Sequence, residues 1–242
     1  MTTSLAKRLA AWVPATLLIA GSVAFIAGGS RHPYVNPTTM GPLGTDEFYR
    51  HFAHTVLSTP GWQAFHTLIL IGPVAWALAA AAVARLFGER GSPFAEVGRH
   101  ALGIGAVLWA LAFVLDGYVA PRYAQAVISA DASSAASAVA TFSANAFTMA
   151  RIGMISIVLI GIAALSLAAA LLLETRVRSW SGIVGAAGLL VGSWPVVAAL
   201  SGEFYPGPFT SVYWTATALA IGLWFLLLGT TFVRPWKAGA DR

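Results

Sequence analysis

Six long apolar stretches constrain most strongly how this chain can fold. They cover roughly residues 10–29, 61–86, 101–120, 147–173, 180–200 and 211–233. Each is close to the length of about 20 apolar residues that one helical crossing of a bilayer requires. Because a segment exposed to lipid must satisfy its own backbone hydrogen bonds, we expect every crossing to be an α-helix. We therefore predict an all-α integral membrane protein, a six-helix transmembrane bundle in which residues 1–242 form a single domain.

Composition agrees with this fold class and excludes several kinds of chemistry. Hydrophobic residues make up 58% of the chain and charged residues only 10%, which is more apolar surface than one soluble domain can bury. The chain has no cysteine, so disulfides, thiolate metal sites and thiol catalysis are excluded. No Walker sequence and no G-x-S-x-G motif occurs, so neither ATP-driven transport nor a serine hydrolase is indicated.

The basic residues predict how the chain is oriented. If the N-terminus is cytoplasmic, ten of the 14 Lys and Arg residues fall on the inner side and four on the outer side. The inner ten are Lys7, Arg8, Arg85, Arg90, Arg99, Arg176, Arg178, Arg234, Lys237 and Arg242. This bias places both termini in the cytoplasm. It also explains the net charge of +5 without a nucleic-acid partner. We expect the protein in a bacterial plasma membrane.

The N-terminal stretch allows a second interpretation. Residues 1–29 also resemble a signal peptide, with Lys7 and Arg8 ahead of an apolar run. That run of about 20 residues exceeds the usual 7 to 15 of a signal-peptide core, which favours a membrane-spanning helix. Cleavage of this segment is left open.

A short amphipathic helix is predicted before the second span, over residues 46–57. Thr45 is a good N-cap, and acidic residues favour the first turn of a helix. Glu47, His51 and His54 stand at positions i, i+4 and i+7, so they share one stripe of this helix. Two interpretations follow: the stripe binds a metal ion, or it is the wet face of a helix that rests in the lipid headgroup layer.

Three ionisable residues lie inside the predicted spans, near their outer ends: His66, Asp116 and Arg151. Such groups are costly in a membrane unless they face one another or a wet cavity, so they indicate a functional site. We predict Glu47, His51, His54 and His66 as metal ligands, with Asp116 as an acceptor behind them. Asp116 and Arg151 are the predicted catalytic pair. The structural alternatives are an Asp116–Arg151 ion pair that joins two helices and a His66 side chain that only donates to a backbone carbonyl.

Imidazole and carboxylate ligands suit copper, iron or zinc. Haem bound by two histidines of the spans is disfavoured, because His100 lies across the bilayer from His66 and His32 lies in an outer loop. The preferred function is a membrane-embedded metal or redox protein, such as an oxidoreductase for a small or lipophilic substrate, with its site on the extracytoplasmic side. One alternative is a transporter or lipid-handling protein that uses Asp116, Arg151 and His66. Another is an accessory subunit of a membrane complex, and membrane lipid, a complex partner or a second copy are the expected partners.

Overall fold

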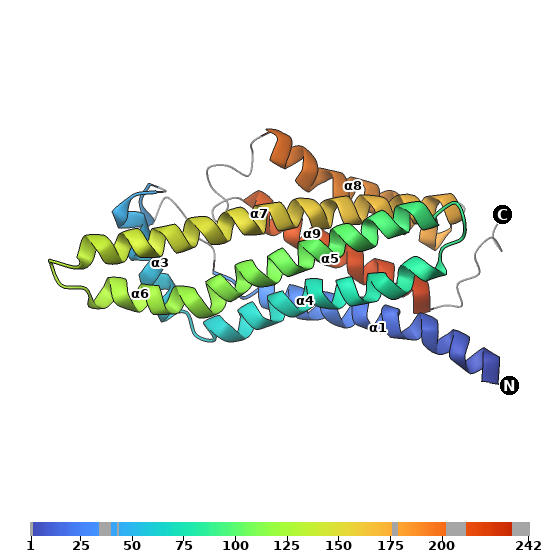
Figure 1. Ribbon diagram of the computed structural model, residues 1–242, viewed down its shortest axis with the longest axis horizontal. Coiled ribbons are helices and arrows are strands. Elements are labelled where there is room, and N and C mark those ends of the chain that lie inside the picture. The colour runs from blue at the N-terminus through green and yellow to red at the C-terminus, as the bar shows by residue number, and fades with distance from the viewer. Residues whose placement is uncertain (1, 34–39, 43, 176–178, 202–211, 234–242) are drawn as a thin grey trace.

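The computed structural model describes residues 2–33, 40–42, 44–175, 179–201 and 212–233, and every element that these residues form is helical (Figure 1). The α-helices are α1 (Thr2–Gly29), α3 (Asp46–Ser58), α4 (Trp62–Val83), α5 (Ser92–Val114), α6 (Ala120–Ser129), α7 (Ala135–Glu174), α8 (Trp180–Ser201) and α9 (Val212–Val233). A 3-10 turn, η1 (Ala84–Leu86), follows α4, and a π-helical turn, η2 (Leu115–Val119), joins α5 to α6. Six helical segments are long and apolar enough to cross a membrane, which is consistent with the predicted helical membrane bundle.

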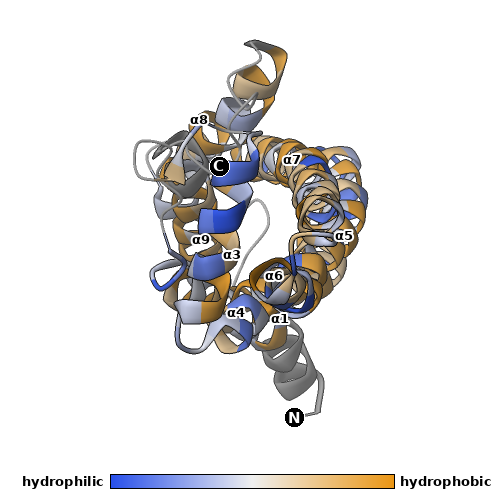
Figure 2. Cartoon of the chain, turned by 90° about the vertical axis from the view of Figure 1, so that its left-hand side faces the viewer, coloured by the Kyte–Doolittle hydropathy of each residue, from blue (hydrophilic) through white to orange (hydrophobic). Residues whose placement is uncertain are grey.

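The six long helices form a closed ring, which Figure 2 shows end-on. Neighbours around the ring are α1 and α4, α4 and α5, α5 and α7, α7 and α8, α8 and α9, and finally α9 and α1. The α4–α5 and α7–α8 pairs are the two hairpins that short connections predict. Helix α1 begins and α9 ends at the same end of the bundle (Figure 1). Which end faces the cytoplasm stays a prediction.

Glycines allow the helices on one side of the ring to approach closely. A Cβ on Gly192 of α8 would lie 2.7 Å from the carbonyl oxygen of Gly161 in α7. A Cβ on Gly188 would lie 2.5 Å from the indole nitrogen of Trp224 in α9. These glycines therefore serve helix packing, as small residues commonly do between membrane helices.

The third and fourth spans are longer than predicted. Residues 121–146 lie between two of the predicted spans, and α6 and the start of α7 form a helical hairpin there (Figure 1). Helix α7 has 40 residues, which corresponds to about 60 Å at 1.5 Å per residue. Pro121 does not end the preceding helix, because the π turn η2 comes directly before it and Pro121 then lies in the first turn of α6, where a missing N–H costs little.

Helix α3 confirms the predicted amphipathic helix, and Thr45 caps it by accepting a hydrogen bond from the Phe48 backbone N–H at 3.3 Å. Its apolar face packs against other parts of the protein. Phe48 and Phe52 are buried, and the ring of Phe52 lies 5.4 Å from that of Phe142 in α7. The helix is therefore held by protein contacts on the α6–α7 hairpin.

Candidate metal centre

Three ligand-type side chains converge where α1, α4 and η2 meet. His66 lies in the second turn of α4, Asp116 lies in η2, and His32 lies in the turn that follows α1. The Nε2 atom of His66 is 2.9 Å from Oδ2 of Asp116, and the Nε2 atom of His32 is 3.5 Å from the same oxygen. One ligand atom from each residue lies within 4.8 Å of the other two. Within the described part of the chain, this is the one group of His, Asp and Glu side chains that can hold a metal ion.

Backbone carbonyls fix the tautomer of both histidines. Nδ1 of His66 lies 2.6 Å from the carbonyl oxygen of Trp62, and Nδ1 of His32 lies 3.1 Å from that of Pro33. A carbonyl oxygen only accepts hydrogen bonds, so each Nδ1 carries the proton and donates. In a neutral imidazole the other nitrogen, Nε2, then has a free lone pair. Both lone pairs are available on the nitrogens nearest to Asp116, an arrangement common among histidines that ligate metals.

When the His66 ring is neutral, its contact with Asp116 brings two acceptor atoms together. Within the described residues, Nε2 of His66 and Oδ1 of Asp116 are buried and have no hydrogen-bond partner. The exposed fraction of His66 is 0% and that of Asp116 is 5%. Leaving such atoms unsatisfied in the interior is costly. A cation held by both residues would satisfy Nε2 of His66, which lies 2.9 Å from the other carboxylate oxygen, Oδ2 of Asp116.

The π turn presents Asp116 to this group. In a π turn the backbone is wider than in an α-helix, and such turns often occur at functional sites. The main-chain carbonyl of Asp116 accepts a hydrogen bond of 2.8 Å from the indole N–H of Trp62. The same Trp62 accepts from His66 through its own carbonyl. Trp62 therefore orients both residues.

Aromatic rings surround His66. The ring centroids of Trp62 and Phe65 both lie 4.6 Å from that of His66, and the centroid of Phe113 lies at 5.7 Å. A Cβ added to Gly117 would come within 2.7 Å of the Cβ of His66. His66 is thus fixed in position, and the low polarity of its walls strengthens electrostatic interactions in the group.

Comparisons with protein-family models, with curated proteins and with solved structures found no match. The function is therefore inferred from the residues and their geometry alone.

The predicted ligands on α3 do not join this group. His51 donates a hydrogen bond from Nδ1 to the carbonyl oxygen of Met40 at 3.1 Å. The Glu47 carboxylate lies close to Gly41, and a Cβ added to that glycine would be 3.1 Å from Oε2 of Glu47. His54 is exposed on the same stripe. In the structure His51 thus binds the backbone at Met40, and Glu47 lies beside Gly41. Metal binding by the stripe of Glu47, His51 and His54 stays a prediction. His66, the fourth predicted ligand, lies in the candidate ligand group with His32 and Asp116.

The structural alternative of an ion pair between Asp116 and Arg151 is not among the described contacts of Asp116. The titratable side chains nearest to the Asp116 carboxylate among the described residues are His32 and His66. The guanidinium of Arg151 lies instead 4.8 Å from the ring centroid of Phe147, one turn earlier in α7. Asp116 therefore stands among the candidate ligands, whereas it was predicted to lie behind them. A catalytic role for Arg151 stays a prediction, as does one for Asp116.

His32 is the member of the group that was not predicted from the sequence. It was assigned to an outer loop, although it follows α1 by only three residues. One signal was present in the sequence: alternating spans predict that the end of the first span lies at the same end of the bundle as His66 and Asp116. Residues directly after a span can reach the level of such groups.

Proposed function

We propose that this protein is a membrane-embedded metal-binding protein, and that His32, His66 and Asp116 hold a single transition-metal ion near one face of the bundle. Two imidazoles and one carboxylate suit copper, iron or zinc. The observation that carries the proposal is the pair of facing acceptors, His66 Nε2 and Asp116 Oδ2, only 2.9 Å apart at a buried position.

Each of the three residues has a distinct part in this proposal. His66 is the anchor, because it is fully buried and both its ring orientation and its tautomer are fixed. Asp116 supplies the negative charge that offsets part of the charge of a divalent ion. The His32 side chain is 27% exposed, so it lies at the edge of the group from which water or a substrate would enter.

Three protein ligands leave further coordination positions open, which is typical of catalytic rather than structural metal sites. A bound copper or iron ion would supply one-electron chemistry there, and zinc would supply a Lewis acid. We propose oxidation or reduction of a small or lipophilic substrate as the activity, since the group lies among apolar and aromatic side chains of the bundle.

A second candidate is supported by the same short contact. A proton shared by His66 and Asp116 would also satisfy two facing acceptors, and buried His and Asp pairs of this kind occur in proton relays. The function would then be proton-coupled transport. The two candidates differ in what they bind, so metal analysis separates them.

The test is the metal content of purified protein. The chain is purified in mild detergent through an affinity tag without histidine, loaded separately with copper, iron or zinc, and dialysed against a weak chelator. We expect about one ion per chain for one of the three metals, because the three ligands form one group. His66→Ala and Asp116→Ala each remove a ligand and should lower retention at least about tenfold.

His54→Ala is the matched control, because it removes an exposed histidine of α3 that lies outside the group. It should retain as much metal as the wild type. Equal metal loss in all three variants, or less than about one tenth of an ion per wild-type chain for every metal, would overturn the proposal. Proton uptake into vesicles that depends on Asp116, in protein without metal, would then favour the transport function.

A further inference from the structure

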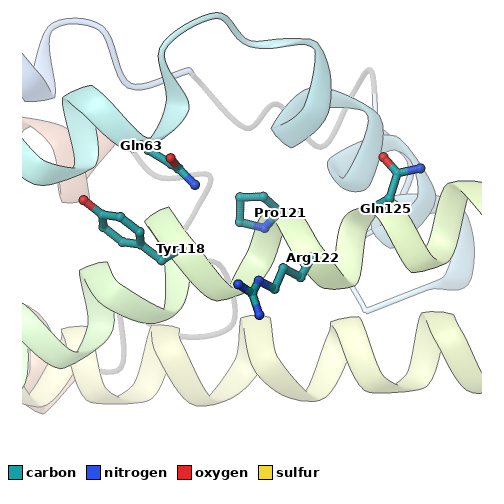
Figure 3. Close-up of a pocket in the computed structure, with 5 residues that line it drawn as sticks. All are labelled: Gln63, Tyr118, Pro121, Arg122 and Gln125. Carbon is teal, nitrogen blue, oxygen red and sulfur yellow. The ribbon is translucent and has the colours of Figure 1, made fainter.

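A second polar feature lies on the outside of the bundle, where α4 meets η2 and α6. It is an open hollow of about 500 Å³ lined by Gln63, Tyr118, Pro121, Arg122 and Gln125 (Figure 3). Gln63 comes from α4, and the other four come from the continuous helical segment of η2 and α6. The hydroxyl of Tyr118 lies 2.6 Å from that of Thr67, which ties the two helices together directly beside the hollow. The hollow is separate from the metal centre, because none of its lining residues is a ligand there.

The lining carries one positive charge and no negative charge. Arg122 is exposed and has no carboxylate partner among the described residues. The amides of Gln63 and Gln125 and the phenol of Tyr118 add neutral donors around it. An arginine fork with neutral donors beside it is well suited to the oxygens of a phosphate group.

Exposed apolar side chains of α4 and α5, together named the groove, continue from the hollow along the bundle. Successive residues at spacings of three and four share one stripe of a helix. On α4, Ile71, Val74 and Leu78 share a stripe with Gln63 and Thr67. On α5, Val107, Leu111 and Val114 lie in line with Tyr118. These side chains are between 37% and 69% exposed: Ile71, Val74, Leu78, Val107, Leu111 and Val114. The two stripes meet at the Thr67–Tyr118 contact, so the groove leads away from the polar hollow into the membrane-spanning part.

We propose that the hollow and this groove form a binding site for one glycerophospholipid, with the phosphate on Arg122 and an acyl chain along α4 and α5. A polar recess with one cation at the head of a long apolar stripe matches an amphiphile of this chemistry. The groove lies on segments that cross the membrane, so acyl chains are the apolar groups available there. An acidic lipid such as phosphatidylglycerol is favoured over phosphatidylcholine, because the choline cation would be repelled by Arg122.

Lipid retention measured by native mass spectrometry tests this site. Protein stripped of lipid in detergent is mixed with phosphatidylglycerol, phosphatidylcholine or diacylglycerol, and the bound fraction is compared. We expect one tightly retained phosphatidylglycerol and at least about tenfold weaker retention of diacylglycerol, which lacks the phosphate. Arg122→Gln should lower phosphatidylglycerol retention by a similar factor. Arg31→Gln, the control, removes an exposed arginine that does not line the hollow and should change nothing.

Two further measurements separate a phospholipid from a free anion and test the acyl groove. Leu111→Gln should weaken lipid retention, because it places an amide in the groove. Inorganic phosphate at millimolar concentration should leave the bound lipid in place, and displacement would show a site for free phosphate instead. If Arg122→Gln does not fold, Arg122→Lys keeps the charge, loses the fork and should give a smaller loss. Equal retention of diacylglycerol and phosphatidylglycerol, or equal retention by the Arg122 and Arg31 variants, would overturn the proposal.

Discussion

Gly117 controls the position of His66 at the scale of single residues. A methyl group on Gly117 would lie 2.7 Å from the Cβ of His66, a backbone-proximal atom that cannot rotate away. Gly117→Ala should therefore push α4 and η2 apart, cost about 1–3 kcal/mol of stability, and weaken metal retention. Thermal unfolding in detergent and metal content after dialysis measure the two effects.

Gly103→Ala is the matched control for that substitution. Gly103 lies in α5, and a Cβ there would meet nothing within 4 Å. The variant should be as stable as the wild type or slightly more stable, because alanine favours a helix interior over glycine by roughly 0.5–1 kcal/mol. If both variants lose stability equally, the close contact with His66 is not the cause.

The imidazoles also predict how metal binding depends on pH. Histidine binds metals as the neutral ring, and free histidine titrates near about pH 6.5. Metal retention should therefore decrease as the pH is lowered, because protons compete with the metal for the ring nitrogens. Metal content at a series of pH values, with Trp fluorescence as a check on folding, measures this. A metal content that stays the same at every pH down to the point where the protein unfolds would contradict ligation by histidine.

A site residue could be predicted from the sequence only when its sequence neighbours made it unusual. His66 and Asp116 stood out because an ionisable group in an apolar stretch is costly. His32 lies in a polar segment, where a histidine is ordinary, and only the turn after α1 brings it to Asp116. The opposite error concerned Arg151, because opposite charges at a similar depth suggested a pair, whereas its guanidinium lies against Phe147.

At the scale of elements, Asp131 stabilises the start of α7. Its Oδ1 accepts hydrogen bonds from the backbone N–H groups of Ser133 and Ser134, at 3.0 and 2.9 Å, and from their hydroxyls. These hydrogen bonds lower the pKa of Asp131 to about 2, and the bond from the Ser134 hydroxyl has the largest effect. Because the pKa is lowered in the folded state, the stabilisation is complete above the unfolded value of about 3.9 and is lost as the pH falls toward about 2.

Asp131→Asn tests this dependence, because the amide keeps an acceptor oxygen but has no charge to lose. The wild type should resist denaturant better than the variant at neutral pH, and the difference should shrink between about pH 4 and pH 2. Unfolding midpoints of both proteins over this range measure it. A difference that is the same at every pH would show that the carboxylate charge is not involved.

The spans were predictable from the sequence, but where they end was not. An apolar run of about 20 residues indicates a crossing. The helix itself continues until it reaches a residue that disfavours helical backbone, such as glycine or proline. The alanine-rich segment at the start of α7 has no glycine or proline, so the helix begins already at Ala135. Proline commonly ends a helix. At Pro121 the chain stays helical, because the π turn η2 ends just before α6 begins.

For the whole molecule, closure of the ring depends on the contact between α7 and α8. A Cβ on Gly192 would lie 2.7 Å from the carbonyl oxygen of Gly161 and from the backbone nitrogen of Leu165, and neither backbone atom can move without its helix. Gly192→Ala should force the helices apart and cost about 1–3 kcal/mol. The unfolding temperature in detergent measures the loss, with Gly103→Ala as the control. An unchanged temperature would mean that α8 is not closely packed in the membrane.

The most direct test of the central claim is the position of a bound metal in the whole protein. Crystals of the protein loaded with copper or zinc would be measured at the absorption edge of that metal. The proposed centre predicts one strong anomalous peak, about 2.0–2.2 Å from Nε2 of His32, Nε2 of His66 and a carboxylate oxygen of Asp116. A peak at Glu47, His51 and His54 with none at His66, or no peak in crystals of loaded protein, would contradict it.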